Sequence, residues 1–316
     1  MKRQLPIVLS TAIFASVSAA QTTTYGPLAL RLPASARALA MADIAIAGRD
    51  DDVIFYNPAQ LVVARGTSMS FERMAPGVYG GTMSTVLRLG SGGLGIGVNY
   101  LEYRVNTGIY PISRDDILDP PPGSVSGTST LATLGFAQVY RGFRIGASAN
   151  YASDEIGIDR FRNIIGDVGV ARDFSRFTTA LSLQHLGAGM DINPPNIAFA
   201  PSTNPLLLGR SIKPPMKATL GAGWAAPAGP LDLTVTAAVS AMREGHVSPG
   251  IGGEASWSWL SGYAISARAG VRDPHEIGDP TLTGGVGFVA DRVALDVAAE
   301  FLKGSRVAYR AGFRIR

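Results

Sequence analysis

The chain has 316 residues, of which 46% are hydrophobic and only 16% are charged, against about 25% charged in an ordinary soluble domain. It contains 38 glycines, 20 prolines and no cysteine, which excludes a disulfide scaffold, a thiolate zinc site, an iron–sulfur cluster and a cysteine nucleophile. The formal net charge of +4 comes mainly from arginine and is too small to predict nucleic-acid binding.

Residues 1–20 are typical of a secretory signal peptide. Lys2 and Arg3 precede an apolar stretch, and Ser18-Ala19-Ala20 supplies the small residues before a cleavage site. The alternative is an N-terminal membrane anchor, but the stretch is too short to cross a bilayer core of about 30 Å as a helix. We therefore expect an exported protein that is cleaved before Gln21.

Residues 21–66 lack the alternation that marks the rest of the chain. Arg37 to Ala47 is typical of a short, alanine-rich helix. An acidic run at 50–52 and an Asn57-Pro58-Ala59 turn follow it. Small residues suit a narrow space, so we predict that residues 21–66 form a plug in the lumen of a barrel.

From residue 67 to 316, apolar and polar residues alternate with the period of a β-strand. The alternating segments are longer than the usual soluble strand and match tilted membrane strands of about nine to eleven residues. Their polar face suits a wet lumen, and aromatic residues lie near segment ends. The pattern predicts an all-β fold, a transmembrane antiparallel β-barrel at 67–316. The alternative is a soluble sandwich or barrel with an apolar interior.

We predict fourteen strands, at 67–76, 79–90, 93–104, 127–140, 142–153, 166–174, 176–187, 215–226, 229–241, 246–257, 262–272, 281–290, 292–302 and 306–316. Long connections are expected at 105–126, 154–165, 188–214 and 273–280, and tight turns at Ser91-Gly92, Arg141, Ser175, Pro227-Ala228 and Asp291. Because the long connections follow only odd-numbered strands, both termini are expected at the periplasmic end. The long connections are either solvated loops or a lid over the lumen.

Residues 35–61 resemble the signature of the FadL-like outer-membrane family, most closely its PorV/PorQ branch. The matching residues are Ser35-Ala36-Arg37-Ala38, Met41-Ala42, Asp50-Asp51 and Phe55-Tyr56-Asn57-Pro58-Ala59-Gln60-Leu61. The resemblance implies a fourteen-stranded barrel with an N-terminal hatch, whose motif here is Arg37, Asp50, Asp51, Tyr56, Asn57, Pro58 and Ala59. Ala42, Asp43 and Gln60 replace the usual glycines, and the last strand ends on Arg316 rather than an aromatic residue.

The resemblance implies one of two functions in the outer membrane of a Gram-negative-type bacterium. The first is passive uptake of fatty-acid-like hydrophobic molecules through a hatch-gated lumen, with Ile54, Phe55, Leu61 and Val62 as expected ligand contacts. The second is a PorV/PorQ-like component of type IX secretion that handles cargo proteins. A mainly structural barrel is a third possibility. Expected partners are outer-membrane lipid, a hydrophobic small molecule, the barrel assembly machinery and, for the second function, secretion-system proteins.

Because every second residue of a strand faces the lumen, the last strands are predicted to carry a ladder of charged side chains on their lumenal face. If residues 303–305 form a hairpin, Ala298 faces Arg310, which then lies diagonal to Asp296 and Glu300. The ladder either satisfies its own charges or contributes to selectivity for a carboxylate. Its members are Asp296, Glu300, Arg310 and Arg314, and the other inward candidates are Arg88, Arg144, Asp232, Glu254, Arg268 and Arg272.

Two features of the plug and its wall have alternative interpretations. The run Asp50-Asp51-Asp52 is expected to pair with wall arginines, the alternative being a calcium site without EF-hand spacing. Gly93, Gly95 and Gly97 lie on the inward face of the third strand, where they permit close approach of the plug or a kink. In transporters of the resembling family, such a kink forms a lateral exit.

The sequence gives little support to catalysis. Ser182 and His185 are three residues apart on one strand, so they are expected on opposite faces. The chain has only three histidines, His185, His246 and His275, and His275 and Glu276 lie in an expected loop without metal-ligand spacing. We predict a protein that is not an enzyme and has neither a cofactor nor a metal site.

Overall fold

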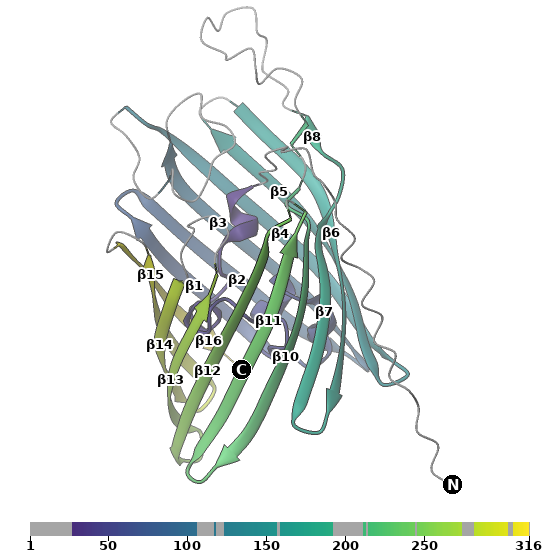
Figure 1. Cartoon of the computed structure of the whole chain (residues 1–316), viewed down its shortest axis with the longest axis vertical. Helices are drawn as coiled ribbons and strands as arrows, with labels where there is room; N and C mark the ends of the chain where they lie inside the picture. The colour runs from purple at the N-terminus through teal and green to yellow at the C-terminus, as the bar shows by residue number, and fades with distance from the viewer. Residues whose placement is uncertain are drawn as a thin grey trace, which may run out of the picture.

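The computed structural model describes residues 27–105, 117, 123–156, 159–191, 211–212, 214–243, 245–273, 281–302 and 306–315. Within these ranges, fourteen antiparallel strands close into a single barrel (Figure 1). Strand β16 pairs with β1, for example Ile315 with Thr67, and this pairing completes the ring. The predicted all-β, fourteen-stranded barrel is confirmed.

The barrel strands are β1 (Gly66–Ala75), β2 (Val78–Leu89), β3 (Gly92–Val105), β4 (Val125–Tyr140), β5 (Phe143–Ile156), β6 (Asp159–Phe174), β7 (Phe177–Leu186), β10 (Lys217–Ala228), β11 (Leu231–Met242), β12 (Val247–Leu260), β13 (Tyr263–Arg272), β14 (Thr281–Ala290), β15 (Val293–Leu302) and β16 (Arg306–Ile315). Strands β8 (Met190–Asp191) and β9 (Ser211–Ile212) form a separate two-stranded sheet.

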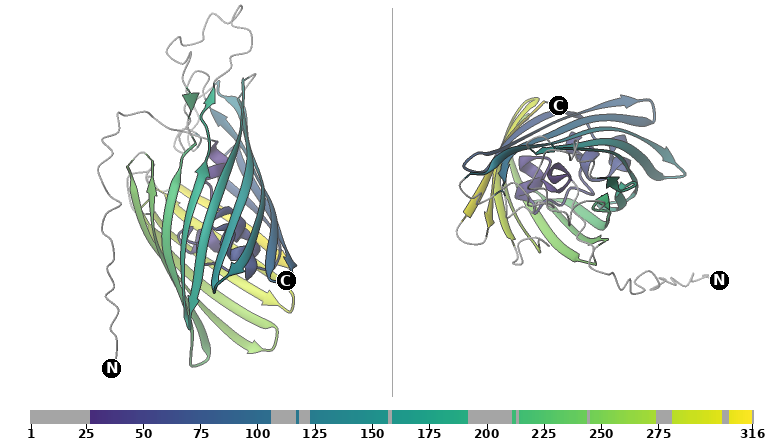
Figure 2. Two further views of the ribbon diagram at one scale, coloured as in Figure 1. Left: turned by 90° about the vertical axis from the view of Figure 1, so that its right-hand side faces the viewer. Right: turned by 90° about the horizontal axis from the view of Figure 1, so that it is seen from above.

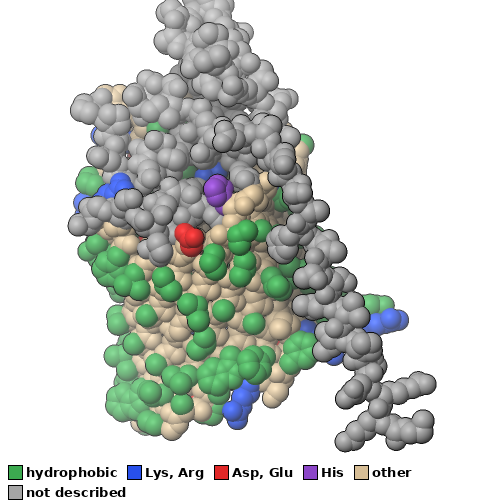
Figure 3. All heavy atoms as spheres, viewed as in Figure 1, with side chains coloured by type: hydrophobic (Ala, Val, Ile, Leu, Met, Phe, Trp, Pro, Cys, Tyr) green, Lys and Arg blue, Asp and Glu red, His purple; other side chains and the backbone are tan. Residues whose placement is uncertain are grey.

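Alternation along each strand sets the two faces of the wall. In β15, Leu295, Val297 and Phe301 are about half exposed on the outside, whereas Asp296 and Glu300 are buried inside. Hydrophobic side chains are spread over the outer surface in the same way (Figure 3). An apolar exterior around a polar interior is the arrangement of a membrane barrel and the reverse of a soluble one.

Tight turns lie at one end of the barrel, where non-glycine residues at positive φ reverse the chain. Arg141, Ser175 and Asp291 have φ of 50°, 58° and 54°, as turn residues of two-residue hairpins do. The turn predicted at Pro227-Ala228 is wrong by two residues, because both pair with β11 and Gly229, at φ 64°, begins the turn. A proline near a strand end forfeits at most one ladder hydrogen bond, so it is tolerated there.

At the opposite end, the connection predicted at 154–165 is also wrong. Strand β5 continues to Ile156 and β6 begins at Asp159, with unbroken pairing between them. Only 157–158 remain between the strands, and these lie outside the described residues. Most of the long connections at 105–126, 188–214 and 273–280 also lie outside them.

The described part of the N-terminal segment lies inside the ring of strands (Figure 2). It forms η1 (Leu28–Arg31), α1 (Ala36–Ala40), η2 (Asp51–Phe55) and η3 (Pro58–Val62). The Ser35 side chain accepts a hydrogen bond from Ala38 N and so caps α1, and Asn57 caps η3 through Ala59 N. We call residues 27–65 the lumenal segment. Among the residues described, no helix is both long and apolar enough to cross a membrane.

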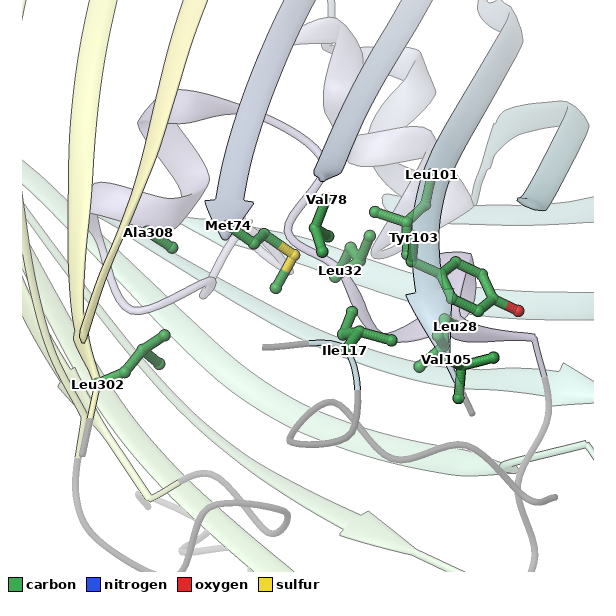
Figure 4. Packing of buried hydrophobic residues seen from close by; sticks show 10 residues of the cluster. All are labelled: Leu28, Leu32, Met74, Val78, Leu101, Tyr103, Val105, Ile117, Leu302 and Ala308. Atoms are coloured by element: carbon green, nitrogen blue, oxygen red, sulfur yellow. The ribbon is translucent and has the colours of Figure 1, made fainter. Parts of the chain in front are cut away.

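An apolar cluster fixes the start of the lumenal segment to the wall near the end with the long connections. Leu28 and Leu32 pack there against wall side chains and against Ile117, which comes from the connection after β3 (Figure 4). The other members are Met74, Val78, Leu101, Tyr103, Val105, Leu302 and Ala308. Burial of this cluster holds the start of the lumenal segment against the wall, with side chains from β1, β2, β3, β15 and β16 in the same cluster.

Candidate functional site

The lumenal segment approaches the wall most closely where the wall has glycine. A Cβ atom on Gly95 would lie 2.5 Å from Leu61 Cδ2, and one on Gly97 would collide with the Phe55 ring. Gly93 faces the Leu61 carbonyl at still shorter range. Strand β3 pairs without a register shift to β2 and to β4, so its ladder has no break at these glycines. Of the two predicted roles, close approach of the lumenal segment accounts for them.

The same fit recurs around the wall. A Cβ atom on Gly146 of β5 would lie 2.5 Å from the Pro58 carbonyl carbon, and one on Gly169 of β6 would meet Asn57 Oδ1. On the other side, a Cβ atom on Gly285 of β14 would lie 2.7 Å from Ala40 Cβ. Any larger side chain at these positions would push the lumenal segment away from the wall.

Arg37 is the centre of an ion-pair network between the lumenal segment and the wall. Its guanidinium lies 2.7 Å from Asp50 Oδ2, and its Nε and Nη2 lie 2.9 and 3.0 Å from the two carboxylate oxygens of Glu254. Arg268 of β13 also pairs with Glu254 and lies 2.6 Å from Asp296. Such charge-assisted pairs are among the stronger protein hydrogen bonds.

Arg314 closes this network on the side of β16. It pairs with Asp50 and lies 3.5 Å from Asp296 Oδ2. Arg37 and Asp50 are therefore tied directly to β12 and β16, and these pairs connect in turn to β13 and β15 through Arg268 and Asp296.

The predicted ladder has different partners. Ala298 does face Arg310, but Arg310 pairs with Glu72 of β1, which lies opposite it in the β1–β16 register. Glu300 instead lies 2.7 Å from Arg272. The prediction considered only one neighbour of β16, whereas barrel closure gives β16 a second one. The alternation along β1 puts Ser70, Glu72 and Met74 on the same inward face, and this was the signal that could have identified Glu72 as a partner of Arg310.

The remaining inward candidates divide into two groups. Arg144 is buried and lies 2.6 Å from Asp173 Oδ2. Arg88 and Asp232 are exposed near the tight-turn end, so neither joins the lumenal network.

The three aspartates of the acidic run have separate partners. Asp51 accepts hydrogen bonds of 2.5 Å from Ser68 and Ser84, and Asp52 accepts one of 2.5 Å from Ser35. Among the described residues, only Asp50 of the three lies within 4 Å of an arginine, so the predicted arginine pairing is wrong there for the other two. Within the described ranges, no group of three or more His, Asp or Glu side chains has the geometry of a metal site.

Burial is the main cause of the pKa shifts of Asp51 and Asp52. It raises the pKa of Asp52 to about 7, and the neighbouring charges of Asp50 and Asp51 add to the effect, while Ser35 and Arg314 oppose it. Burial also raises the pKa of Asp51, against the hydrogen bonds from its two serines.

Ala42 and Asp43, which replace glycines of the family signature, keep the backbone that glycine would adopt. Both have φ of 59°, in the left-handed region. The Asp43 carboxylate then accepts a hydrogen bond from Tyr56 Oη and lies 3.0 Å from Arg272 Nη1. Gln60, the third replacement, donates to the Ile46 carbonyl at 3.1 Å. Each polar replacement thus has a hydrogen-bonding partner in the lumen.

A cavity of about 150 Å³ lies between the lumenal segment and the ends of β7, β10, β11, β12 and β13 nearest the long connections. The lumenal segment lines one side with Leu30, Leu32, Ile44, Ile46 and Phe55. The wall lines the other side with polar groups, among them Asn99, Gln184, His185, Lys217, Thr219, Ser240 and Arg272. An apolar side facing a few polar groups is typical of small-molecule sites.

Of the four predicted ligand contacts, only Phe55 lines this cavity. Ile54, Leu61 and Val62 pack instead with Val86 and Ala137 against the wall, so they do not line this cavity, and their expected contact with a ligand stays a prediction. The Leu61 and Ile54 side chains fill the space beside Gly95 of β3.

Lys217 is a charged side chain among the cavity residues that could not be found from the sequence motifs. It begins β10, and none of the described carboxylates lies within 4 Å of its ammonium group. The neighbouring cation, Arg272, is held by Asp43 and by Glu300 at 3.0 and 2.7 Å. A lysine after two prolines, at the start of an alternating segment, was the available signal.

His185 also lines the cavity, because the wall is irregular there. The β6–β7 register shifts between Gly166 and Val168, and His185 adopts φ of 59°. Ser182 and His185 are consequently both buried, so their prediction on opposite faces is wrong. His185 Nδ1 lies 2.9 Å from the Pro215 carbonyl, and Ser182 Oγ has no hydrogen-bond partner in the part of the chain that the structure describes.

No protein-family model and no curated protein matches the chain. Among solved structures, it is similar to the toluene transporter TodX of Pseudomonas putida, with a TM-score of 0.56 and 10% identity over 89% of this chain and 96% of that one. It is also similar to the toluene transporter TbuX of Ralstonia pickettii, with a TM-score of 0.55 and 12% identity over 93% of this chain and 98% of that one. A third similar structure is a FadL homologue of Pseudomonas aeruginosa, with a TM-score of 0.50 and 8% identity over 89% of this chain and 96% of that one. At such identities the likeness shows a shared barrel fold.

Proposed function

We propose that this protein is an outer-membrane channel for passive uptake of small hydrophobic molecules, not an enzyme, and that its lumenal segment is a hatch. In this proposal residues 1–20 are a cleaved signal peptide, residues 21–66 form the hatch and both termini are periplasmic. Two findings support it: an apolar barrel exterior and the fold shared with structures described as toluene transporters.

The observation that carries the proposal is the cavity above the lumenal segment. Its volume of about 150 Å³ is close to that of protein cavities that hold one benzene ring. Leu30, Ile44 and Phe55 offer an apolar surface to such a ligand, and the end of the barrel with the long connections is the nearest opening. A small aromatic hydrocarbon therefore fits better than a long acyl chain.

The lumenal segment blocks further passage below the cavity. It packs against β3, β5 and β14 through glycines, and Arg37 and Asp50 tie it to the opposite wall. Ligand passage then requires this segment to shift, with Arg37 leaving Glu254 or Arg314 leaving Asp50. Since β3 is paired on both sides throughout, the proposed exit leads through the lumen instead of through the wall at β3.

The test is toluene uptake by whole cells that carry either the wild type or a variant in which the cavity is filled. Leu30→Trp places a large side chain in the cavity and is expected to reduce the initial uptake rate several-fold. The matched control, Leu295→Trp, adds the same side chain on the lipid-facing surface and leaves uptake unchanged. Unchanged uptake in folded Leu30→Trp protein would show that the cavity is not on the route.

The secretion alternative gains no support from the similar structures, which are described as transporters and channels. The two functions predict different phenotypes for a strain that lacks this protein. A deletion strain is expected to lose toluene uptake and to keep its surface-displayed cargo proteins. Loss of cargo display with normal uptake would favour the PorV/PorQ-like function.

A further inference from the structure

The outer surface at the tight-turn end is uneven around the barrel. Over β4 to β7, it carries three exposed arginines interleaved with four exposed aromatic side chains. We call this set the arginine–aromatic sector, and it consists of Tyr140, Arg141, Phe143, Arg172, Phe174, Arg176 and Phe177. Figure 3 shows basic side chains at this end of the barrel.

Pairing of β5 with β6 explains how the sector is held together. Because Arg144 pairs with Ala171, the next positions on the outer face bring Phe143 and Arg172 side by side. The Arg172 guanidinium carbon lies 4.7 Å from the Phe143 ring centre and 5.1 Å from that of Phe174. Arg141 lies 5.2 Å from the Tyr140 ring in the same way. These cation–π contacts hold the guanidinium groups against the barrel at the height of the aromatic belt.

The sector has positive charge that the described protein does not neutralise. The neighbouring carboxylate, Asp173, faces the lumen and is engaged by Arg144 at 2.6 Å. None of the described residues forms an ion pair with Arg141, Arg172 or Arg176. Their exposed guanidinium groups are therefore available to an anion.

The opposite side of the same end provides an internal comparison. Over β12 to β14 the belt is a cluster of Trp257, Trp259, Tyr263 and Phe288, with ring centres 5.5 to 6.3 Å apart. No arginine occurs in β10, β11 or β12, or in the tight turns at 229–230 and 261–262, and Arg243 lies in the connection at the other end of β11. Arginines are thus interleaved with the aromatic belt over β4 to β7, whereas over β12 to β14 the belt is an aromatic cluster and Arg292 lies only in the turn after β14.

We propose that the arginine–aromatic sector is a binding site for the phosphate of an anionic phospholipid. Guanidinium groups bind phosphate oxygens in a bidentate manner, and aromatic rings lie at the depth of lipid head groups. The acyl chains would then lie along the apolar outer faces of β4 to β7. A zwitterionic lipid offers the same phosphate but adds a cationic group that the three arginines repel. This inference rests on the proposed membrane placement and is independent of what the channel carries.

The test is native mass spectrometry of the full-length protein in a neutral detergent with added phosphatidylglycerol or phosphatidylcholine of identical acyl chains. The wild type is expected to bind phosphatidylglycerol about tenfold more tightly than phosphatidylcholine, since each interfacial arginine favours an anionic lipid. The triple variant Arg141→Gln, Arg172→Gln, Arg176→Gln is expected to lose this preference.

A second triple variant serves as the matched control. Arg104, Arg160 and Arg162 are also exposed, but they lie at the other end of β3 and β6. Replacing these three by Gln removes the same charge and is expected to leave the preference within twofold of wild type. Equal binding of both lipids by the wild type, or an equal loss in both triple variants, would overturn the proposal. Migration of unheated samples on gels confirms that each barrel is folded, and failed toluene uptake would not affect the result.

Discussion

At the scale of single residues, ligand preference is expected to depend on Lys217. This side chain lines the cavity without a carboxylate within 4 Å among the described residues. Lys217→Met removes the charge and adds apolar surface of similar length, so affinity for toluene should rise about three- to tenfold. Binding to the purified protein measures this, with exposed Arg73→Met as the control. Weaker toluene binding in Lys217→Met would place the ligand elsewhere.

Asp52 is expected to make the docking of the lumenal segment sensitive to pH. Its folded pKa of about 7 lies above that of an exposed aspartate, so the folded state holds the proton more tightly than the unfolded chain. The stabilisation is therefore present at acidic pH and is lost as the pH rises from about 4 to 7. Asp51 acts in the same direction, since its pKa is also raised.

The measurement is thermal unfolding of the wild type and of Asp52→Asn at pH 5 and pH 8. The wild type is expected to melt at a lower temperature at pH 8, and Asp52→Asn, which stays neutral, should show a smaller difference. Asn can still accept the hydrogen bond from Ser35. Identical pH dependence in the two proteins would assign the effect to other groups.

At the scale of elements, glycines in the wall determine how the lumenal segment fits. A Cβ atom on Gly146 would lie 2.5 Å from backbone atoms of Pro58, whereas one on Gly284 would meet nothing nearer than 3.7 Å. Gly146→Ala is therefore expected to lower the free energy of unfolding by about 1–3 kcal/mol, and Gly284→Ala to leave it nearly unchanged. Urea unfolding in detergent compares the two. Equal stabilities would mean that η3 is not packed tightly against β5.

Strand positions could be predicted from alternation because lipid forces one face of every strand to be apolar. Alternation failed where that constraint ends. The outer parts of β5 and β6 carry Glu155 and Arg160 beyond the apolar band, so they resemble a loop in sequence. It also failed at His185, since a shift in register cannot be inferred from one strand alone.

At the scale of the whole molecule, the cavity could not be predicted from sequence. Its lining comes from the lumenal segment and from β3, β4, β7 and β10 to β13, and which side chains face it depends on how η2 and η3 pack. Phe55 was predicted as an apolar residue of the plug, whereas Lys217 belongs to no motif. The ion pairs between Arg37, Asp50 and the wall likewise require barrel closure, which brings β16 beside β1.

Movement of the lumenal segment is the step on which the proposed function depends, and the absence of native cysteine allows it to be blocked selectively. A Cβ atom on Gly312 of β16 would lie 3.4 Å from Ala36 Cβ, close to disulfide geometry of about 3.5–4.5 Å. In Ala36→Cys, Gly312→Cys, oxidation is expected to stop toluene uptake by whole cells and reduction to restore it, while each single variant transports under both conditions. Undiminished uptake by the fully oxidised double variant would contradict a moving hatch.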